Sequence, residues 1–338
     1  MFKRPTLFVL GAGSSAEVGL PVGTQLAETI GKKMDIRFEH GFKPIGYGDL
    51  ELFQHVTNQR RSDTEPYQRA AWLIRDGIGL ARSIDDFLDL HRSNTYVNRY
   101  GKAAIAKAIT EAERESRLFA GEHTGAITFD LREVTGTWLV KFMHMLSPGI
   151  PKENVRHIFD NVSFIVFNYD RCLEHFLSKA LPKLYGIRDE EAIEIVRSLP
   201  ILHPYGIVGD APFGFGRTDY FASPDAIKTY TEQIGDTDVI AKLVAEVERA
   251  ECIVFLGFAF HSQNMQMLKP QKRPERRKFI YGTAYQMSDS DVEIVSEQLV
   301  TFLQPNMDST ARARIRLENK LRSTDLFDHY AKSLTGGD

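Results

Sequence analysis

The sequence predicts an α/β fold: a doubly wound parallel sheet with an all-helical insertion. Four short, almost continuously apolar segments, at residues 7–10, 162–167, 252–256 and 278–281, have the composition of strands buried on both faces. Segments with helical periodicity separate most of them, and this alternation is typical of parallel βαβ units. From about residue 52 to 145 the pattern is helical throughout, which interrupts the alternation.

The first strand leads directly into the turn Gly11-Ala-Gly-Ser-Ser-Ala16. A Gly-x-Gly-x-x-Ala turn between a strand and a helix binds pyrophosphate in Rossmann-like folds, because glycine lets the backbone approach and the helix N-terminus supplies free N–H groups. We therefore predict that this turn binds a dinucleotide through Gly11, Ala12, Gly13, Ser14 and Ser15. The alternative is that the glycines serve only the geometry of the turn, since such a motif is weak by itself.

The residues after this turn do not favour a long first helix. Gly19, Pro21 and Gly23 follow closely, and a proline inside a helix costs ~3 kcal/mol. We therefore expect a loop here, with Thr24 as the N-cap of the next helix. A dinucleotide oxidoreductase would instead need an unbroken helix and an acidic residue on its second strand, for which Asp35 is the candidate.

The later elements follow in chain order. Ser83 is placed to cap a helix that begins at Ile84. Periodicity predicts further helices at residues 102–118, 138–145, 171–184, 189–197, 238–250 and 289–302, and a short strand at 200–203. We expect three parts, namely a Rossmann-like nucleotide-binding domain (1–37 and 150–305), a helical insertion (38–149) and a C-terminal helical tail (306–338).

Composition excludes several classes of protein. The chain has 338 residues and a net charge of −3, which does not point to nucleic acid or an anionic membrane surface. No apolar run approaches the ~20 residues of a membrane span. The first strand starts too early to leave room for a signal peptide, so we expect a cytoplasmic protein. Cys172 and Cys252 are too few for a four-cysteine zinc site, and we expect no metal.

Polar residues follow several predicted strands. Asn168-Tyr-Asp170 follows the strand at 162–167, and His203 ends the short strand at 200–203. Gly257-Phe-Ala-Phe-His261 follows the strand at 252–256. Ligands of doubly wound sheets bind at the carboxyl ends of the strands. We therefore expect these residues to converge on one cleft with the glycine turn.

These motifs resemble the sirtuin-like NAD-binding superfamily. Gly11-Ala-Gly-Ser-Ser15 with Gly19-Leu-Pro-Val-Gly23 is similar to the opening of that superfamily. Asn168-Tyr-Asp170 resembles its Asn-x-Asp element, and His203 resembles its catalytic histidine. Leu256-Gly-Phe-Ala-Phe-His-Ser-Gln-Asn264, Tyr281-Gly-Thr-Ala284 and Ser83-Ile-Asp-Asp-Phe-Leu88 are similar to segments of the zinc-free NAD hydrolases of prokaryotic antiphage systems. The resemblance covers most of residues 5–305.

The sequence also departs from that superfamily. The zinc ribbon of the protein deacylases is absent, their Thr-Gln-Asn reads Val166-Phe-Asn168, and their His-Gly reads His203-Pro-Tyr-Gly206. These differences disfavour deacylation and leave NAD⁺ binding and cleavage as the expected chemistry.

The resemblance implies roles for individual residues. An Asn168 amide can position both the ribose hydroxyls and the attacking water, and His203 can act as general base. Asp170, by the resemblance, hydrogen-bonds the nicotinamide carboxamide. Asp85 is a further candidate for the pocket. NAD⁺ itself is expected to contact the glycine turn together with Pro21, Thr24, Gly257, Phe258 and Thr283.

The expected function is therefore an NAD⁺ glycohydrolase that depletes NAD⁺ in antiphage defence. The resemblance implies a homo-oligomer and a separate sensor, such as a helicase-type ATPase, as partners. Three alternatives stay open: a module that binds NAD⁺ or ADP-ribose without turnover, a dinucleotide oxidoreductase and a protein deacylase. The sequence leaves the trigger undetermined.

Overall fold

The computed structural model describes residues 2–39, 43–45, 47–58, 64–119, 130–211, 214–217, 226–272, 277–303 and 310–336. At its centre is a six-stranded sheet in the order β5-β4-β1-β6-β7-β8, with every neighbouring pair parallel. Its strands are β1 (Thr6–Leu10), β4 (Val162–Val166), β5 (Ile201–Leu202), β6 (Cys252–Leu256), β7 (Phe279–Thr283) and β8 (Ile315–Glu318). The predicted doubly wound parallel α/β fold is confirmed.

The order of the strands creates a switch point beside β1. In β1, Thr6 lies opposite Val162 of β4 on one side and opposite Cys252 of β6 on the other. The chain builds the sheet outward through β4 and β5, then returns across β1 to add β6, β7 and β8. In such sheets the connections leave in opposite directions at this point, which opens a crevice at the carboxyl edge.

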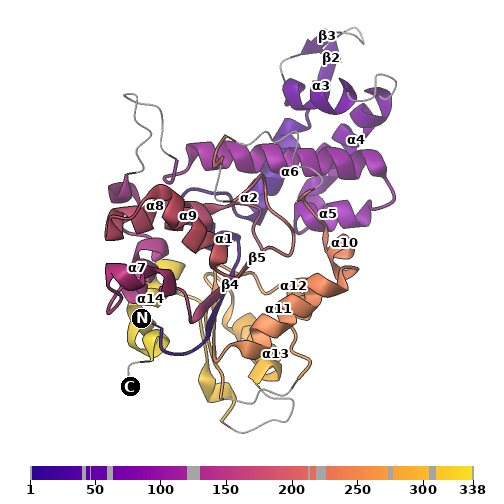
Figure 1. Ribbon diagram of the computed structural model, residues 1–338. Helices are drawn as coiled ribbons and strands as arrows, with labels where there is room; N and C mark the ends of the chain where they lie inside the picture. Colours follow the sequence, from indigo (N-terminus) through magenta and orange to yellow (C-terminus); the bar gives the residue numbers. More distant parts are fainter. Residues whose placement is uncertain are drawn as a thin grey trace.

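Helices cover both faces of the sheet (Figure 1). They are α1 (Ala12–Ala16), α2 (Gly23–Lys33), α3 (Leu50–Asn58), α4 (Thr64–Gly77), α5 (Ile84–Leu90), α6 (Thr95–Glu115), α7 (Trp138–Leu146), α8 (Cys172–Tyr185), α9 (Asp189–Ser198), α10 (Tyr230–Ile234), α11 (Thr237–Arg249), α12 (Ser262–Met267), α13 (Asp289–Leu303) and α14 (Ser323–Thr335). Short 3₁₀ segments lie at Ile78–Leu80, Leu131–Val134, Lys152–His157 and Arg312–Arg314. No helix among the described residues combines the length and apolar character that crossing a membrane requires.

The hydrophobic core has two layers because side chains alternate along each strand. Leu7 and Val9 of β1 point into the layer formed with α2, α6, α11 and α13. Phe8 and Leu10 point into the opposite layer, where Phe142 of α7 and Phe327 of α14 pack. The ring centroids of Phe8 and Phe142 are 5.3 Å apart with an edge-on geometry, an arrangement that aromatic pairs prefer.

The segment expected to be an all-helical insertion is not entirely helical. It contains β3 (Lys43–Ile45), which pairs antiparallel with β2 (Arg37–Glu39) in a separate two-stranded sheet. The hairpin stands with α3 and α4 at one end of the molecule, away from the main sheet (Figure 1). At the other end of the segment, α7 packs against α14 over the main sheet, so it belongs with the sheet's helices.

The C-terminal segment also differs from the expected helical tail. Residues 315–318 form β8, the edge strand of the main sheet, in register with β7 so that Ile280 lies opposite Ile315. The helical periodicity of α14 led to the prediction of a helical tail. A strand as short as β8 shows too little alternation of apolar and polar residues to be recognised in the sequence.

One local prediction near the first turn was wrong, and the structure also bears on the oxidoreductase alternative. Helix α2 begins at Gly23 with Val22 as its N-cap, so Thr24 lies inside the first turn and does not cap it. Asp35 precedes β2, which lies outside the main sheet, and its carboxylate binds Arg37 and Arg75. Asp35 therefore lacks the position that a dinucleotide oxidoreductase would require.

Candidate functional site

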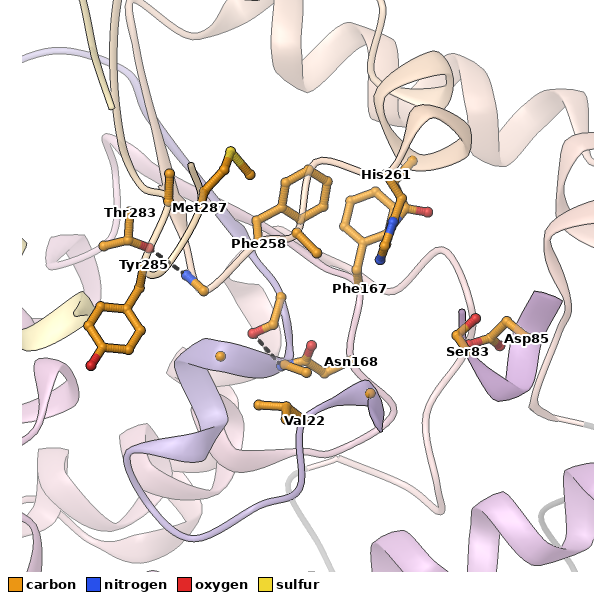
Figure 2. Close-up of a pocket in the computed structure, with 18 of the residues that line it drawn as sticks. Val22, Ser83, Asp85, Phe167, Asn168, Phe258, His261, Thr283, Tyr285 and Met287 are labelled. Atoms are coloured by element: carbon orange, nitrogen blue, oxygen red, sulfur yellow. Dashed lines mark hydrogen bonds between the residues drawn. The ribbon is translucent and has the colours of Figure 1, made fainter. Parts of the chain in front are cut away.

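A cavity of about 530 Å³ opens at the carboxyl edge of the sheet, beside the switch point. Figure 2 shows Asn168 near its middle, Thr283 and Tyr285 at one end, and Ser83 and Asp85 at the other. The predicted residues that line it are Gly11, Ala12, Gly13, Asp85, Asn168, Gly257, Phe258, His261 and Thr283. The remaining predicted residues, Ser14, Ser15, Pro21, Thr24, Asp170 and His203, are not among its lining residues.

The glycines of the first turn are packed against the turn that follows β6. A Cβ added to Gly11 would lie 2.5 Å from the Gly257 carbonyl oxygen, and one added to Gly13 would lie 2.8 Å from the Gly257 Cα. Gly257 has a φ of +57°, and its own added Cβ would lie 2.0 Å from the Ser14 nitrogen. These glycines are therefore needed for contact between the two turns, in line with the turn-geometry alternative.

The backbone N–H groups of this turn are largely occupied within the protein. The amides of Gly11 and Gly13 donate to the carbonyls of Leu256 and Gly257, and the Ser14 amide donates to Gly11. By contrast, the amides of Ala12, Phe258 and Ala259 donate to no group of the described residues. The N–H groups available to a ligand are therefore shared between the turns after β1 and β6.

Asn168 presents its carbonyl group to the cavity. Its side-chain nitrogen donates to the Gly11 carbonyl at 3.1 Å and to the Ser15 hydroxyl at 3.0 Å. The residue is only 7% exposed, and its Oδ1 accepts no hydrogen bond from the residues that the structure covers. The two bonds hold the amide plane, so Oδ1 is fixed as an acceptor on the cavity wall.

Asp170 lies behind that wall. Its Oδ1 accepts hydrogen bonds from the Ser15 hydroxyl and from the Cys172 amide, both at 3.0 Å. The second bond satisfies a free N–H group at the first residue of α8, whose N-cap position is occupied by Arg171. Burial raises the pKa of this carboxyl, against hydrogen bonds from Cys172 and Ser15 that lower it. Ser14 and Ser15 are both buried in the same layer.

His203 forms a buried pair with Glu174 of α8. The distance from its Nε2 to Glu174 Oε1 is 2.7 Å, and the two side chains are 10% and 6% exposed. Its Nδ1 lies 3.4 Å from the Asn168 carbonyl oxygen. Burial opposes the charged imidazolium, but Glu174 outweighs it and the pKa of His203 is raised. His203 thus contacts the backbone of Asn168 and belongs to the layer behind the cavity.

Asp85 and Tyr169 connect α5 to the loop that carries Asn168. The Tyr169 hydroxyl donates to Asp85 Oδ1, and burial, followed by the Asp85 charge, raises the pKa of that hydroxyl. Asp85 lines the cavity. Burial raises its pKa to about 6, partly offset by the Tyr169 hydrogen bond. The cavity therefore has a carboxylate that titrates close to neutral pH.

Aromatic side chains of Phe167 and Phe258 form part of the cavity wall. The rings of Phe167 and Phe258 are 5.1 Å apart, and Phe258 also packs on Phe260. Phe260 has a φ of +53°, a strained value for a residue with a side chain. The Tyr205 hydroxyl donates to Asn264 Oδ1 at 2.6 Å beside this wall.

The remaining expectations concern the loop before α2 and the absence of a metal. Val22 and Gly23 line the main cavity, whereas Thr24 lines a separate cavity of about 480 Å³ next to Arg75. Among the described residues, no group of three or more His, Cys, Asp or Glu side chains could hold a metal ion.

Sequence reasoning missed Glu174, Tyr169 as a partner of Asp85, and the Tyr205–Asn264 pair. Glu174 lies four residues after Asp170. This spacing indicates that two residues share one side of a helix, but it does not predict that Glu174 pairs with His203. The amphipathic pattern of α8 contains other acidic and basic residues, so nothing local distinguished this glutamate.

No model of a known protein family matches the sequence, and no curated protein is similar to it. Among solved structures, the fold is similar to that of a chain described as a Sir2 homolog–NAD complex, with 12% identity and a TM-score of 0.36. The alignment covers 98% of this chain and 91% of that chain. At this identity and TM-score, the overlap carries no assignment of function.

Proposed function

We propose that the protein is an NAD⁺ glycohydrolase, which cleaves the nicotinamide–ribose bond and releases nicotinamide and ADP-ribose. The main support is one cavity that brings the glycine turn, the Asn168 carbonyl and a titratable carboxylate together at the carboxyl edge of a parallel sheet. Its volume of about 530 Å³ lies within the range of small-molecule sites.

The free amides near the glycine turn support binding of the pyrophosphate. Ala12 and Phe258 offer N–H groups from the turns after β1 and β6, and both residues line the cavity. Gly257 and Thr283 shape the same wall, because the Thr283 hydroxyl accepts a hydrogen bond from the Gly257 amide at 2.8 Å. We place the dinucleotide along this wall, with Gly11 and Gly13 beneath it and Pro21 and Thr24 at its margin.

The chemistry proposed for this site is displacement at the anomeric carbon. The bond between that carbon and the nicotinamide nitrogen breaks through an oxocarbenium-like state, as in glycoside hydrolysis. The fixed Asn168 Oδ1 accepts a hydrogen bond from a ribose hydroxyl or from the attacking water. Asp170 and His203 act as positioning residues, since both bind the loop and the serine that hold Asn168.

The biological setting is proposed from the motif resemblance. A homo-oligomer acting with a separate sensor protein in the cytoplasm would deplete NAD⁺ during phage infection. Because such an activity harms the host cell, we expect it to be restrained until the partner signals.

The test is nicotinamide release from NAD⁺ by the purified protein, measured by chromatography beside Asn168→Ala and His203→Ala. Asn154→Ala is the matched control, because that asparagine is exposed on the 3₁₀ segment 152–157. We expect release by wild type and by the control, and at least a ~100-fold loss in Asn168→Ala. Release that survives in Asn168→Ala, with thermal unfolding unchanged, would contradict the assignment of Asn168.

A second candidate is a module that binds NAD⁺ or ADP-ribose without turnover. The placement of Asp170 and His203 behind the cavity wall favours it, because neither reaches a bound ligand from there. Calorimetry separates the two proposals: tight NAD⁺ binding without nicotinamide release, with or without a partner protein, would support the module.

A further inference from the structure

The proposed hydrolysis needs a group that accepts a proton from water, and Asn168, Asp170 and His203 do not supply one at the cavity. Asn168 does not ionise. Asp170 accepts hydrogen bonds from Ser15 and Cys172 in the layer below. The Nε2 of His203 is paired with Glu174, and its Nδ1 faces the Asn168 carbonyl.

Asp85 has the geometry that Asn168, Asp170 and His203 lack. It lines the cavity, and one of its carboxylate oxygens accepts a hydrogen bond from Tyr169. No other described residue donates a hydrogen bond to the second oxygen, Oδ2, although the backbone amide of Asp85 also lowers the pKa of this carboxyl. Figure 2 shows the Asp85 side chain at one end of the cavity, with Asn168 between it and Thr283.

The position of Asp85 relative to Asn168 is set by two connections. Tyr169 is the residue next to Asn168, so the same loop carries the amide and the partner of the carboxylate. Ser83 caps α5 by accepting a hydrogen bond from the Asp86 amide at 3.1 Å, which fixes the turn that carries Asp85. Protein contacts therefore hold both Asn168 and Asp85 in place before any ligand binds.

Charged and titratable groups of α5, α6 and α10 surround Asp85. On its own helix, Asp86 pairs with Arg82, and Asp89 accepts from the Thr231 amide of α10. Tyr205 and His261 line the same cavity. The neighbouring helices α6 and α10 contribute the Lys102–Glu232 pair.

Burial is the largest influence on the pKa of Asp85, and Asp89 and Asp86 also raise it. Hydrogen bonds from Tyr169 and from its own backbone lower it, and the net pKa is about 6. A carboxylate of this pKa is mostly ionised at pH 7 and is a stronger base than an exposed aspartate.

We infer that Asp85 is the catalytic base of the proposed glycohydrolase reaction, an inference that rests on that function. The water oxygen bonds to the anomeric carbon as the carbon–nitrogen bond breaks, and the bonding pair stays on nicotinamide, which leaves neutral. The water proton passes to Asp85 and then to solvent. NAD⁺ and water thus yield nicotinamide, ADP-ribose and one proton.

Asp85→Asn tests the inference, with Asp76→Asn as a control that removes the same charge from an exposed site on α4 outside the cavity lining. We expect kcat for nicotinamide release to fall ~100-fold or more in Asp85→Asn, as general-base removal does, with KM and NAD⁺ affinity within about threefold of wild type. Asp76→Asn should stay within about twofold of wild type. Added formate should restore part of the rate to Asp85→Ala and none to Asn168→Ala.

The pH profile gives a second readout. Wild-type kcat should decline as the pH falls below about 6, because the base becomes protonated. Tyr169→Phe removes a hydrogen bond that lowers the pKa of Asp85, so this decline should move to higher pH.

The outcomes separate this inference from the proposed function. Wild-type turnover that persists in Asp85→Asn overturns the base role and leaves the glycohydrolase intact. Loss of NAD⁺ affinity with unchanged kcat also overturns it and makes Asp85 a binding contact. No nicotinamide release by wild type, alone or with its partner, overturns both proposals.

Discussion

The two loops on either side of the glycine turn are held by different forces. The loop after β4 carries Asn168 and is fixed by side-chain hydrogen bonds to Ser15, Cys172 and Asp85. The loop after β6 carries Gly257 and is fixed by backbone contact with the glycine turn, with Thr283 as its one described side-chain donor or acceptor.

The first loop fixes the orientation of a polar side chain, whereas the second loop fixes the path of the backbone. Polar groups buried in the first loop are costly when left unpaired, so that loop has a defined orientation for Asn168. The second loop leaves the N–H groups of Phe258 and Ala259 without an acceptor among the described residues, which suits contact with a ligand. Substitutions should therefore damage the first loop by deleting partners and the second by adding atoms.

The largest effect is expected for Gly257→Ala. The new Cβ would lie 2.0 Å from the Ser14 nitrogen at a φ of +57°, so the turns must separate, at a cost of about 3 kcal/mol or more. Urea unfolding measures this loss. Gly79→Ala is the control, because a Cβ there meets nothing within 4 Å. Equal stabilities for the two variants would show that the turns are not in close contact.

Next comes Glu174→Gln, which removes the partner of His203 and should cost about 3 kcal/mol at pH 6. Because the folded pKa of His203 is raised, the pair stabilises fully below the unfolded pKa of about 6.5 and loses this contribution as the pH rises through the folded value. Wild type should therefore lose stability as the pH rises above about 6.5, and Glu174→Gln should lose less. The exposed His157 provides the control: His157→Ala should retain the wild-type slope. A variant with the same slope as wild type would contradict the role of the pair.

A smaller effect on stability is expected for Ser15→Ala. The variant leaves Asn168 and Asp170 without one partner each, which should cost about 2 kcal/mol. It should lower nicotinamide release by more than its stability suggests, because Asn168 is no longer held. The measurement is the rate of nicotinamide release by wild type and by Ser15→Ala at a temperature where both stay folded. An unchanged rate would mean that Ser15 does not orient Asn168.

The smallest effect is expected for Thr283→Val, which removes the hydrogen bond to the Gly257 amide and should cost about 1 kcal/mol. The control is Thr301→Val, whose hydroxyl is exposed and bonds to Gln298 in its own helix. A shift of the unfolding midpoint no larger than that of the control would mean that glycine contact alone holds the second loop.

Most of the fold could be predicted because its signals are local. The apolar segments at 162–167 and 252–256 became central strands, and Ser83 caps α5 as expected. β8 and the β2–β3 hairpin were missed, since three- and four-residue strands lack a periodic signal. The site was predicted in part: Asn168 and the first glycines line the cavity, while His203 and Asp170 stand behind it.

The sequence by itself determined the parallel α/β class and the residues that end its strands, because apolar runs and glycine turns act through neighbouring residues. Only the tertiary structure decided which polar side chains face the cavity. That choice depends on the strand order, which brings β4 and β6 to either side of β1. It also depends on contacts between distant segments, such as Tyr169 with Asp85 and His203 with Glu174, that leave no periodic mark in the chain.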